Sequence, residues 1–200
     1  MSRVFVLLGH PNIQSYNGYL ADRIVAGLTD AGHQVRRQNA GEIVFDPVLH
    51  EGYNAIQPLE PDLLDFQENL TWCDHWVVIY PLWWGSTPAV VRGLIDRAVF
   101  PSFAFEPEVG GPAVTPLLGG RTGHVVTTMD APATYVRDAY RDSDLAEMQI
   151  AVMTFCGIAP GIALRLDEIS FRTDAERVAL ADEAAAAILA AVGEDLSRKR

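Results

Sequence analysis

The stretch HWVVIYPLWWGSTPAVVRGLIDR, residues 75–97, joins a buried strand to an amphipathic helix through a turn that carries two adjacent tryptophans. Its first six residues are almost continuously apolar, which is typical of a strand that is covered on both faces in a parallel sheet. Pro88 follows two hydroxyl residues near the first helical position, and apolar residues then recur at helical spacing. The stretch therefore predicts one strand–turn–helix unit of an α/β fold.

Apolar runs alternate with amphipathic stretches along the rest of the chain, which predicts a five-stranded parallel sheet. The predicted strands cover residues 3–8, 34–39, 75–80, 123–128 and 161–166. The predicted helices run from about Asn17 to Ala31, from Pro88 onward, from Ser143 toward Phe155, and from the capping-box pair Thr173 and Glu176 to Gly193. Residues 41–61 and 100–121 look irregular, and loops of that length in a compact domain are usually functional.

Length and composition indicate a single globular domain. The chain has 200 residues, of which 49% are hydrophobic and 20% are charged, so it can bury one core. No internal repeat, low-complexity linker or change of composition marks a second unit. One domain is therefore predicted over residues 1–193, followed by a frayed tail over residues 194–200.

The charge and the cysteines limit the expected partners and compartment. A formal net charge of -11 would repel phosphate backbones and anionic lipid, so we expect neither a nucleic acid nor a membrane surface as partner. Cys73 and Cys156 each lie among apolar residues, which indicates buried thiols in a reducing compartment. The apolar run near the N-terminus has only five residues, too short for a signal sequence or a membrane span, and a cytoplasmic location is predicted.

The segment GHPNIQSYN, residues 9–17, follows the first predicted strand and contains a single glycine. It therefore lacks both the G-x-G-x-x-G dinucleotide fingerprint and the Walker phosphate loop. Ser15 and Asn17 stand just before a helix N-terminus, where free backbone N–H groups and the helix dipole favour an anion such as a phosphate. The alternative is that Asn17 merely caps its helix while Ser15 makes a turn. His10 could donate to a phosphate, act as an acid, or fill the turn before Pro11.

Three predicted loops follow the carboxyl ends of strands, where open α/β sheets bind their ligands. They cover residues 9–17, 81–88 and 127–135. The first offers groups that suit a phosphate, the second a flat aromatic surface, and the third hydroxyls and backbone amides. A flat ring system with a phosphate tail would suit all three. The histidines show no ligand-like spacing with acids or cysteines, so no metal site is predicted.

Seven motifs, spread over nearly the whole chain, carry a family resemblance. They are His10, SYN (15–17), FDP (45–47), PLWWGSTPAVVRGLIDR (81–97), FAF (103–105), TTMDAPATY (127–135) and FCGI (155–158). In this order they resemble the flavodoxin-like NAD(P)H:quinone oxidoreductase family, which includes the ancillary oxidoreductases of bacterial potassium-efflux systems. The resemblance implies a doubly wound five-stranded parallel sheet in the order 2-1-3-4-5 with helices on both faces. It also implies a homodimer with active sites at the subunit interface.

The same resemblance implies a bound flavin, FAD or alternatively FMN. FAD is favoured by the SYN motif together with Arg177, which falls near the arginine that FAD-binding members place on the adenosine half. The residues implied to hold the phosphates and the adenosine end are His10, Ser15, Tyr16 and Asn17. Those implied to line the ring are Pro81, Leu82, Trp83 and Trp84, with Gly85 presenting a backbone amide. Those implied to border the pyrimidine side are Thr127, Thr128, Met129 and Asp130, while Tyr135 takes the place of the family's active-site tyrosine.

Two places depart from the family pattern. Met129 and Asp130 stand where many members have two glycines, so their side chains would narrow the substrate pocket. Arg141 stands six residues after Tyr135, where animal quinone reductases have a histidine. An arginine stays protonated and cannot relay a proton, but it can offset negative charge.

The implied activity is the transfer of hydride from NADH or NADPH through the flavin to a quinone or other flat acceptor. The two substrates would occupy one pocket in turn, which is a ping-pong cycle. Backbone amides around Thr128 to Asp130, with Tyr135 and Arg141 nearby, would stabilise the negative charge of the reduced flavin. Alternatives stay open: a regulatory ancillary subunit of a potassium-efflux transporter, a flavodoxin-type electron carrier, and reduction of azo or nitro compounds.

Overall fold

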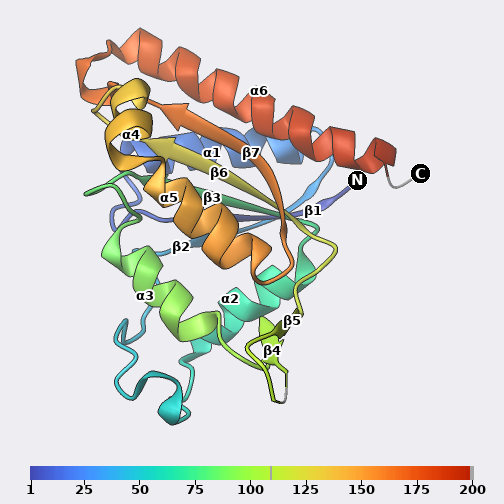
Figure 1. Cartoon of the computed structure of the whole chain (residues 1–200). Helices are drawn as coiled ribbons and strands as arrows, with labels where there is room; N and C mark the ends of the chain where they lie inside the picture. Colours follow the sequence, from blue (N-terminus) through green and yellow to red (C-terminus); the bar gives the residue numbers. More distant parts are fainter. Residues whose placement is uncertain (109, 199–200) are drawn as a thin grey trace.

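The five predicted strands pair side by side in a computed structural model, which describes residues 1–108 and 110–198, the last four by their backbone alone. The sheet is parallel throughout, in the order β2-β1-β3-β6-β7, so the predicted fold class and strand order are confirmed (Figure 1). A separate antiparallel pair, β4 and β5, lies within the segment predicted to be irregular. The elements are β1 (Arg3–Leu8), α1 (Tyr16–Asp30), β2 (Gln34–Asn39), η1 (Gly52–Asn54), α2 (Pro61–Trp72), β3 (His75–Pro81), α3 (Ala89–Ala98), β4 (Phe105–Pro107), β5 (Val114–Pro116), β6 (Thr122–Thr128), α4 (Ala133–Tyr140), α5 (Ser143–Leu145), η2 (Ala146–Thr154), β7 (Ala159–Leu166), η3 (Ile169–Phe171) and α6 (Asp174–Arg198).

Side chains of β1 alternate between two apolar clusters, one on each face of the sheet. Val4, Val6 and Leu8 pack in the cluster formed with α1 and α6. Phe5 and Leu7 pack in the cluster formed with α2, α3 and η2. Figure 1 shows the same two layers of helices, above and below the sheet. Because both faces are covered, the strand has a continuous apolar sequence and not an alternating one.

Helix α2 is not among the predicted helices. It begins at Pro61, the last residue of the segment predicted to be irregular, and buries Leu63, Phe66 and Leu70 at helical spacing. Helix α4 is also additional. The helix predicted from Ser143 is present, but after α5 it winds as the π-helix η2.

Helix α6 continues to Arg198, so the predicted helix end at Gly193 is wrong. A Cβ atom at Gly193 would meet nothing within 4 Å, so the residue lies on an open helix surface. A glycine there costs about 1 kcal/mol relative to alanine and does not by itself end the helix. The frayed tail predicted over residues 194–200 stays a prediction, because residues 199 and 200 lie outside the described residues.

The parallel register places the ends of β1, β3 and β6 along one edge of the sheet. Leu8 lies beside Ile79, and Pro81 lies beside Thr128. The amide of Gly9, the first residue after β1, still donates to the carbonyl of Ile79 at 2.7 Å. The loops that follow these three strands therefore begin side by side.

Cys73 and Cys156 are free and buried, as predicted. Burial raises the pKa of the two thiols to about 12 and about 11, so both stay protonated near neutral pH. Within residues 1–108 and 110–198, no helix is long and apolar enough to cross a membrane. The same part of the chain has no group of three or more histidine, cysteine, aspartate or glutamate residues that could hold a metal ion.

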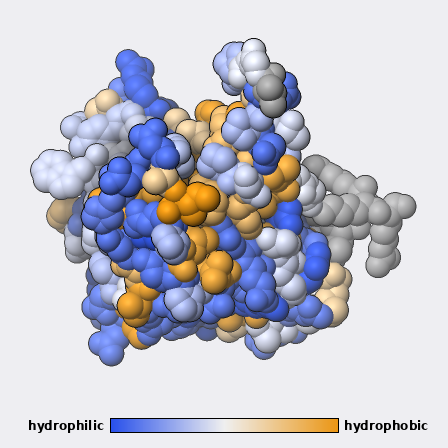
Figure 2. Space-filling view, turned by 90° about the horizontal axis from the view of Figure 1, so that it is seen from below, coloured by the Kyte–Doolittle hydropathy of each residue, from blue (hydrophilic) through white to orange (hydrophobic). Residues whose placement is uncertain are grey.

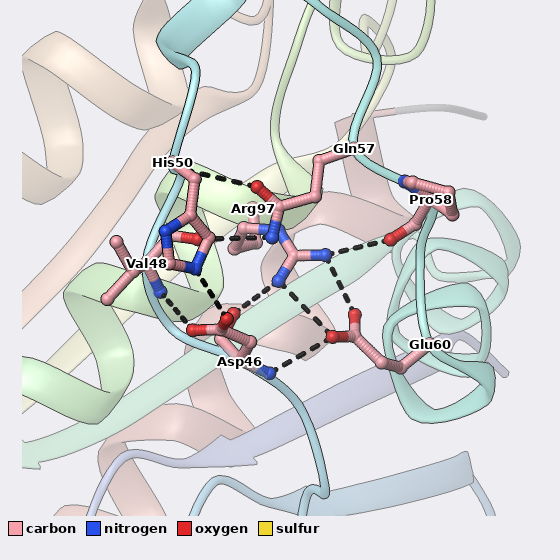
Figure 3. A network of polar contacts seen from close by, with 7 residues as sticks. All are labelled: Asp46, Val48, His50, Gln57, Pro58, Glu60 and Arg97. Carbon is pink, nitrogen blue, oxygen red and sulfur yellow. Dashed lines mark hydrogen bonds and ion pairs between the residues drawn. The ribbon is translucent and has the colours of Figure 1, made fainter.

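Arg97 of α3 holds the long loop between β2 and α2 against the domain (Figure 3). Its buried guanidinium donates to the carbonyl oxygens of Asp46 and Pro58 and forms an ion pair with Glu60 at 2.8 Å. The carboxylate of Asp46 also pairs with the ring of His50 at 2.7 Å. Burial alone would raise the pKa of Glu60, but hydrogen bonds from two backbone amides and from Arg97 lower it below its usual range.

A cavity of about 330 Å³ lies between this loop and the end of α3. Leu49, Tyr53, Ile56 and Phe100 are among the residues that line it, and Ile56 is 97% exposed. Figure 2 shows this side of the molecule, with hydrophobic residues gathered in the middle of a largely hydrophilic surface. None of the residues predicted to bind a cofactor lines this cavity, so it is separate from the predicted site.

We expect Arg97→Met to lower the free energy of unfolding by about 3 kcal/mol, measured by urea denaturation. The substitution removes the guanidinium that donates to the Glu60 carboxylate and to two carbonyl oxygens, while the Asp46 amide still donates to Glu60. Because the folded protein lowers the pKa of Glu60, the pair stabilises the fold above the usual pKa of glutamate and loses this effect as the pH falls through the lowered value. The difference between wild type and variant should therefore narrow below about pH 4.

The control for this experiment is Arg23→Met, which removes an exposed ion pair with Asp182. Exposed pairs of this kind contribute less than about 1 kcal/mol. A loss of stability as large as that of Arg97→Met would show that burial of the Arg97 pair has no special effect.

Candidate functional site

A tight turn after β3 presents the two tryptophans at the carboxyl edge of the sheet. The amides of Trp83 and Ser86 each donate to the other residue's carbonyl at 3.1 Å. Between them, φ is 55° at Trp84 and 73° at Gly85, as a type I′ turn requires. The left-handed conformation costs a residue other than glycine about 1 kcal/mol or more. The side chain of Trp84 is nevertheless 100% exposed, so the turn holds a flat apolar surface open to solvent.

Gly85 brings this turn into contact with helix α4. A Cβ atom at Gly85 would lie 3.3 Å from the ring of Tyr140, so both the close approach and the positive φ favour glycine. Tyr140 contacts Tyr135 edge to face, with 5.5 Å between the ring centroids, and Tyr135 is half exposed. Tyr135 is therefore connected to the turn through Tyr140, a residue that no sequence motif singles out.

Arg141 follows Tyr140 and ends helix α4 in the left-handed conformation, with φ of 56°. Its side chain is exposed and forms no hydrogen bond or ion pair with any residue in the described part of the chain.

The loop after β1 folds back on the first turn of α1. Ser15 caps this helix by accepting from the amide of Gly18 at 3.2 Å, so the alternative that Asn17 is the cap is wrong. A Cβ atom at Gly18 would lie 1.8 Å from the carbonyl oxygen of Ile13, and only glycine allows this approach. Since the helix supplies no acceptor for its first amides, Tyr16 and Asn17 present N–H groups at the positive end of the helix dipole.

His10 joins the first loop to the second. Its ring lies edge-on to that of Trp83, with 5.6 Å between the centroids. Its Nδ1 atom is 2.9 Å from both the backbone nitrogen and the backbone oxygen of Asn12. Burial lowers the pKa of His10, and the hydrogen bond to Asn12 opposes this shift only in part. The imidazole is therefore mostly neutral at pH 7.

Buried polar side chains tie the third loop to the other two. The amide of Asn17 and the hydroxyl of Thr128 are joined by hydrogen bonds of 2.8 and 3.1 Å, and both side chains are buried. The amide of Leu82, directly after Pro81, donates to the carbonyl of Thr128 at 2.8 Å. Thr127 is also buried, and its hydroxyl donates to Asp144. The polar atoms of these predicted binding residues were expected to face a cofactor. They instead form the hydrogen bonds that connect the loops.

Met129 and Asp130 are likewise engaged within the chain. The amide of Met129 donates to the carbonyl of Leu166 at 2.9 Å, so it is not the free donor that was predicted. Its side chain is 5% exposed and packs in the interior, so it does not narrow an open pocket as expected. The carboxylate of Asp130 accepts from the amide of Ser170 at 2.9 Å and anchors the segment after β7.

Tyr16 and Arg177, both predicted for the adenosine end, lie in contact where α1 packs on α6. The hydroxyl of Tyr16 donates to the carbonyl of Arg177 at 2.8 Å. The guanidinium of Arg177 pairs with Asp174 one turn earlier. Burial raises the pKa of Tyr16, so its hydroxyl remains a donor.

Asp144, the second residue of the short helix α5, is fully buried. Its carboxylate pairs with Arg165 of β7 at 2.7 Å and accepts from the hydroxyls of Tyr80 at 3.3 Å and Thr127 at 3.4 Å. Arg165 also pairs with Asp142 at 3.0 Å. Burial and the charge of Asp144 raise the pKa of Tyr80 well above its usual value. Of these residues only Thr127 belongs to a sequence motif, because the network joins residues of three strands to the segment that follows α4.

The flavodoxin-like fold family matches residues 2–191, which is almost the whole chain. The chain belongs to this family. The resemblance stated from the sequence is thereby confirmed, and the loops after β1, β3 and β6 lie where sheets of this kind bind ligands.

Three known proteins illustrate the similarity within this family. A Haemophilus influenzae protein named as an uncharacterized NAD(P)H oxidoreductase is 30% identical over 109 residues, or 52% of this chain and 54% of that protein. The Mus musculus ribosyldihydronicotinamide dehydrogenase (quinone) is 25% identical over 193 residues, or 82% of each chain. A solved FMN-dependent NADH-azoreductase from Bacillus anthracis, in complex with FMN, has a TM-score of 0.72 at 15% identity and covers 95% of this chain and 98% of its own.

These similarities differ in what they establish. The chain spans about half the length of the bacterial and fungal curated relatives it matches, but most of the mouse protein. The azoreductase, at its low identity, shows the fold alone. The family is therefore established, whereas the identity of the reaction depends on the chemistry of the site.

We expect Asn17→Ala to lower the free energy of unfolding by about 1–3 kcal/mol, because it leaves the buried hydroxyl of Thr128 without its partner. Thr128→Val removes the other half of the pair. The double variant should lose less than the sum of the single losses, with a coupling of about 1 kcal/mol in urea denaturation.

The matched control is Asn54→Ala, because Asn54 is exposed on the long loop. A surface substitution of this kind should change stability by less than about 0.5 kcal/mol. Strictly additive losses from Asn17→Ala and Thr128→Val would contradict the role of the pair in joining the two loops.

Proposed function

We propose that this protein is a flavin-dependent NAD(P)H oxidoreductase that reduces a quinone or a similar flat acceptor. The observation that carries the proposal is the fully exposed indole of Trp84, which a strained turn holds at the carboxyl edge of the sheet. An exposed apolar surface does not stabilise the fold, whereas it can bind a planar ring. The names of the Haemophilus and mouse relatives, which mention NAD(P)H and quinone, support this activity.

The described residues fit a flavin in two respects. Trp84 offers a flat apolar face for the ring, and the first-turn amides of Tyr16 and Asn17 suit a phosphate. The residues proposed to hold the cofactor, directly or through the shape of their loops, are His10, Ser15, Tyr16, Asn17, Pro81, Leu82, Trp83, Trp84, Gly85, Thr127, Thr128, Met129, Asp130 and Arg177. When bound, a flavin supplies hydride transfer between the nicotinamide and the acceptor.

The side chains around the turn have separate proposed roles. Tyr135 is half exposed, and we assign to its hydroxyl a hydrogen bond to an oxygen of the acceptor. Arg141 offsets negative charge that develops during reduction, since its guanidinium is exposed and always protonated. Asn17 and Thr128 act by fixing the loops, because their polar groups are paired with each other. In this proposal both substrates bind in turn at the exposed face of Trp84.

The finer identity of the cofactor is also part of the proposal. The contact between Tyr16 and Arg177 supports FAD, whereas the FMN named for the Bacillus anthracis structure keeps FMN as the alternative. NADH and NADPH are both retained as donors. The homodimer, the cytoplasmic location and the transporter partner stay predictions. A flavodoxin-type electron carrier is less favoured, because one-electron transfer has no need of Tyr135 and Tyr140 beside the turn.

The protein should be yellow as purified, or should take up FAD or FMN. Its flavin absorbance should fall on anaerobic addition of NADH or NADPH and return when a quinone is added. Mass analysis of the cofactor released by heat distinguishes FAD from FMN. A colourless protein that binds neither flavin would rule out the proposed function.

Two substitutions test the proposed surface. Trp84→Ala should weaken flavin binding by at least about fivefold, because it removes the aromatic face. Tyr135→Phe should leave flavin binding unchanged but slow turnover with the quinone by about tenfold or more. Trp72→Ala is the control: Trp72 lies under the guanidinium of Arg36, at the other end of β3. An equal loss of flavin from Trp84→Ala and Trp72→Ala would place the cofactor elsewhere.

A further inference from the structure

Two side chains from one short segment reach the turn that carries Trp84. The hydroxyl of Ser143, the first residue of α5, donates to the carbonyl of Gly85 at 2.5 Å. The carboxylate of Glu147, in the first turn of η2, accepts from the hydroxyl of Ser86 at 2.6 Å. Residues four apart lie on the same side of a helical segment, so Ser143 and Glu147 both face the turn. Their contacts lie on the two residues that follow Trp84.

Glu147 is itself held in place by a second set of contacts. Its other carboxylate oxygen accepts from the hydroxyl of Thr87 at 3.4 Å and pairs with Arg92 of α3 at 3.3 Å. Arg92 is in turn paired with Asp96 at 2.6 Å. A carboxylate that accepts hydrogen bonds from both hydroxyls and a guanidinium is more strongly held than one in a single surface ion pair.

Asp144, the residue after Ser143, anchors the same segment in the core. Its ion pair with Arg165 and its contacts with Tyr80 and Thr127 reach the ends of three strands. Neighbouring residues of this segment therefore contact the interior of the sheet on one side and the exposed turn on the other. The position of the turn relative to the strand ends is set through this segment.

The turn needs such support, because its backbone is strained and its principal side chain is not packed. Trp84 has a φ of 55°, and because its indole is exposed, no burial of apolar surface offsets the cost of this backbone strain. The two hydrogen bonds between Trp83 and Ser86 are also near the surface, where water competes for them. We propose that Ser143 and Glu147 are positioning residues, which keep the Trp83–Ser86 turn in its left-handed form and thereby fix the direction of the Trp84 indole. The part of this inference that concerns flavin binding by the indole rests on the proposed function.

Amide hydrogen exchange of Trp83 and Ser86 tests the inference without any cofactor. In Ser143→Ala and Glu147→Ala, these two amides should exchange about tenfold faster than in wild type, since each variant removes one strong hydrogen bond to the turn. The amides of Val77, Val78 and Ile79 in β3 should keep their wild-type rates. Glu147→Gln, which retains an acceptor for Ser86, should restore most of the protection.

The matched control is Glu183→Ala, which removes an exposed glutamate of α6 on the opposite side of the sheet and should leave every one of these rates unchanged. Wild-type exchange at Trp83 and Ser86 in both Ser143→Ala and Glu147→Ala would overturn the inference. Faster exchange throughout β3 would overturn it as well, because the two residues would then support the whole domain and not the turn.

The dissociation constant for FAD separates this inference from the proposed function. Ser143→Ala and Glu147→Ala should raise it about threefold to tenfold, in the same direction as Trp84→Ala. If Trp84→Ala leaves FAD binding unchanged, the proposed site is wrong, while the exchange rates still decide whether the turn is positioned as inferred. If Trp84→Ala weakens FAD binding but Ser143→Ala and Glu147→Ala do not, the positioning role is wrong and the site is retained.

Discussion

The parallel pairing of β1, β3 and β6 determines where every part of the candidate site can lie. Because adjacent parallel strands end at the same edge, the loops at 9–17, 81–88 and 127–135 begin side by side although more than 100 residues separate the first from the last. The two layers of helices make this arrangement stable, since each face of β1 is buried in its own apolar cluster. The register of these strands is therefore the constraint on which the site depends.

Polar groups along this edge are mostly used to connect the loops. Asn17 with Thr128, and Thr127 with Asp144, are buried pairs whose hydrogen bonds offset the cost of removing them from water. The same residue types would serve equally well as ligands to a cofactor, and type alone does not distinguish the two uses. The hydrogen bonds therefore fix the loops relative to one another.

The turn at Trp84 differs from the rest of this edge, because its principal side chain has no partner in the core. It combines a left-handed tryptophan whose indole is fully exposed with a glycine in contact with Tyr140, so the strain at Trp84 is not offset by burial of its side chain. Residues in such conformations persist where the surroundings hold them, and the contacts from Ser143 and Glu147 supply that support. The strained turn and the segment that holds it form one unit, in which the exposed surface has a defined orientation.

The sequence by itself determined the fold class, the five strands and the order of the family motifs. The fold class and the strands follow from the spacing of apolar residues and from helix-start signals such as Pro88, and both are local features of the sequence. It also indicated that Trp84 stands at a strand end. It did not reveal α2, although Leu63, Phe66 and Leu70 recur at helical spacing, or the continuation of α6 past Gly193, where an open surface tolerates glycine.

Only the tertiary structure decided how the site residues are used. Ser15 caps α1, and the amide of Met129 donates to the carbonyl of Leu166. Tyr140, Ser143 and Glu147 contact the tryptophan turn. The Met129–Leu166 contact and the three contacts at the tryptophan turn join residues that are tens of positions apart in the sequence, and no local pattern encodes which residues meet. The physical reason is that hydrogen-bond partners are chosen by proximity in the folded chain, whereas the periodicity of a sequence specifies only which face of each element is buried.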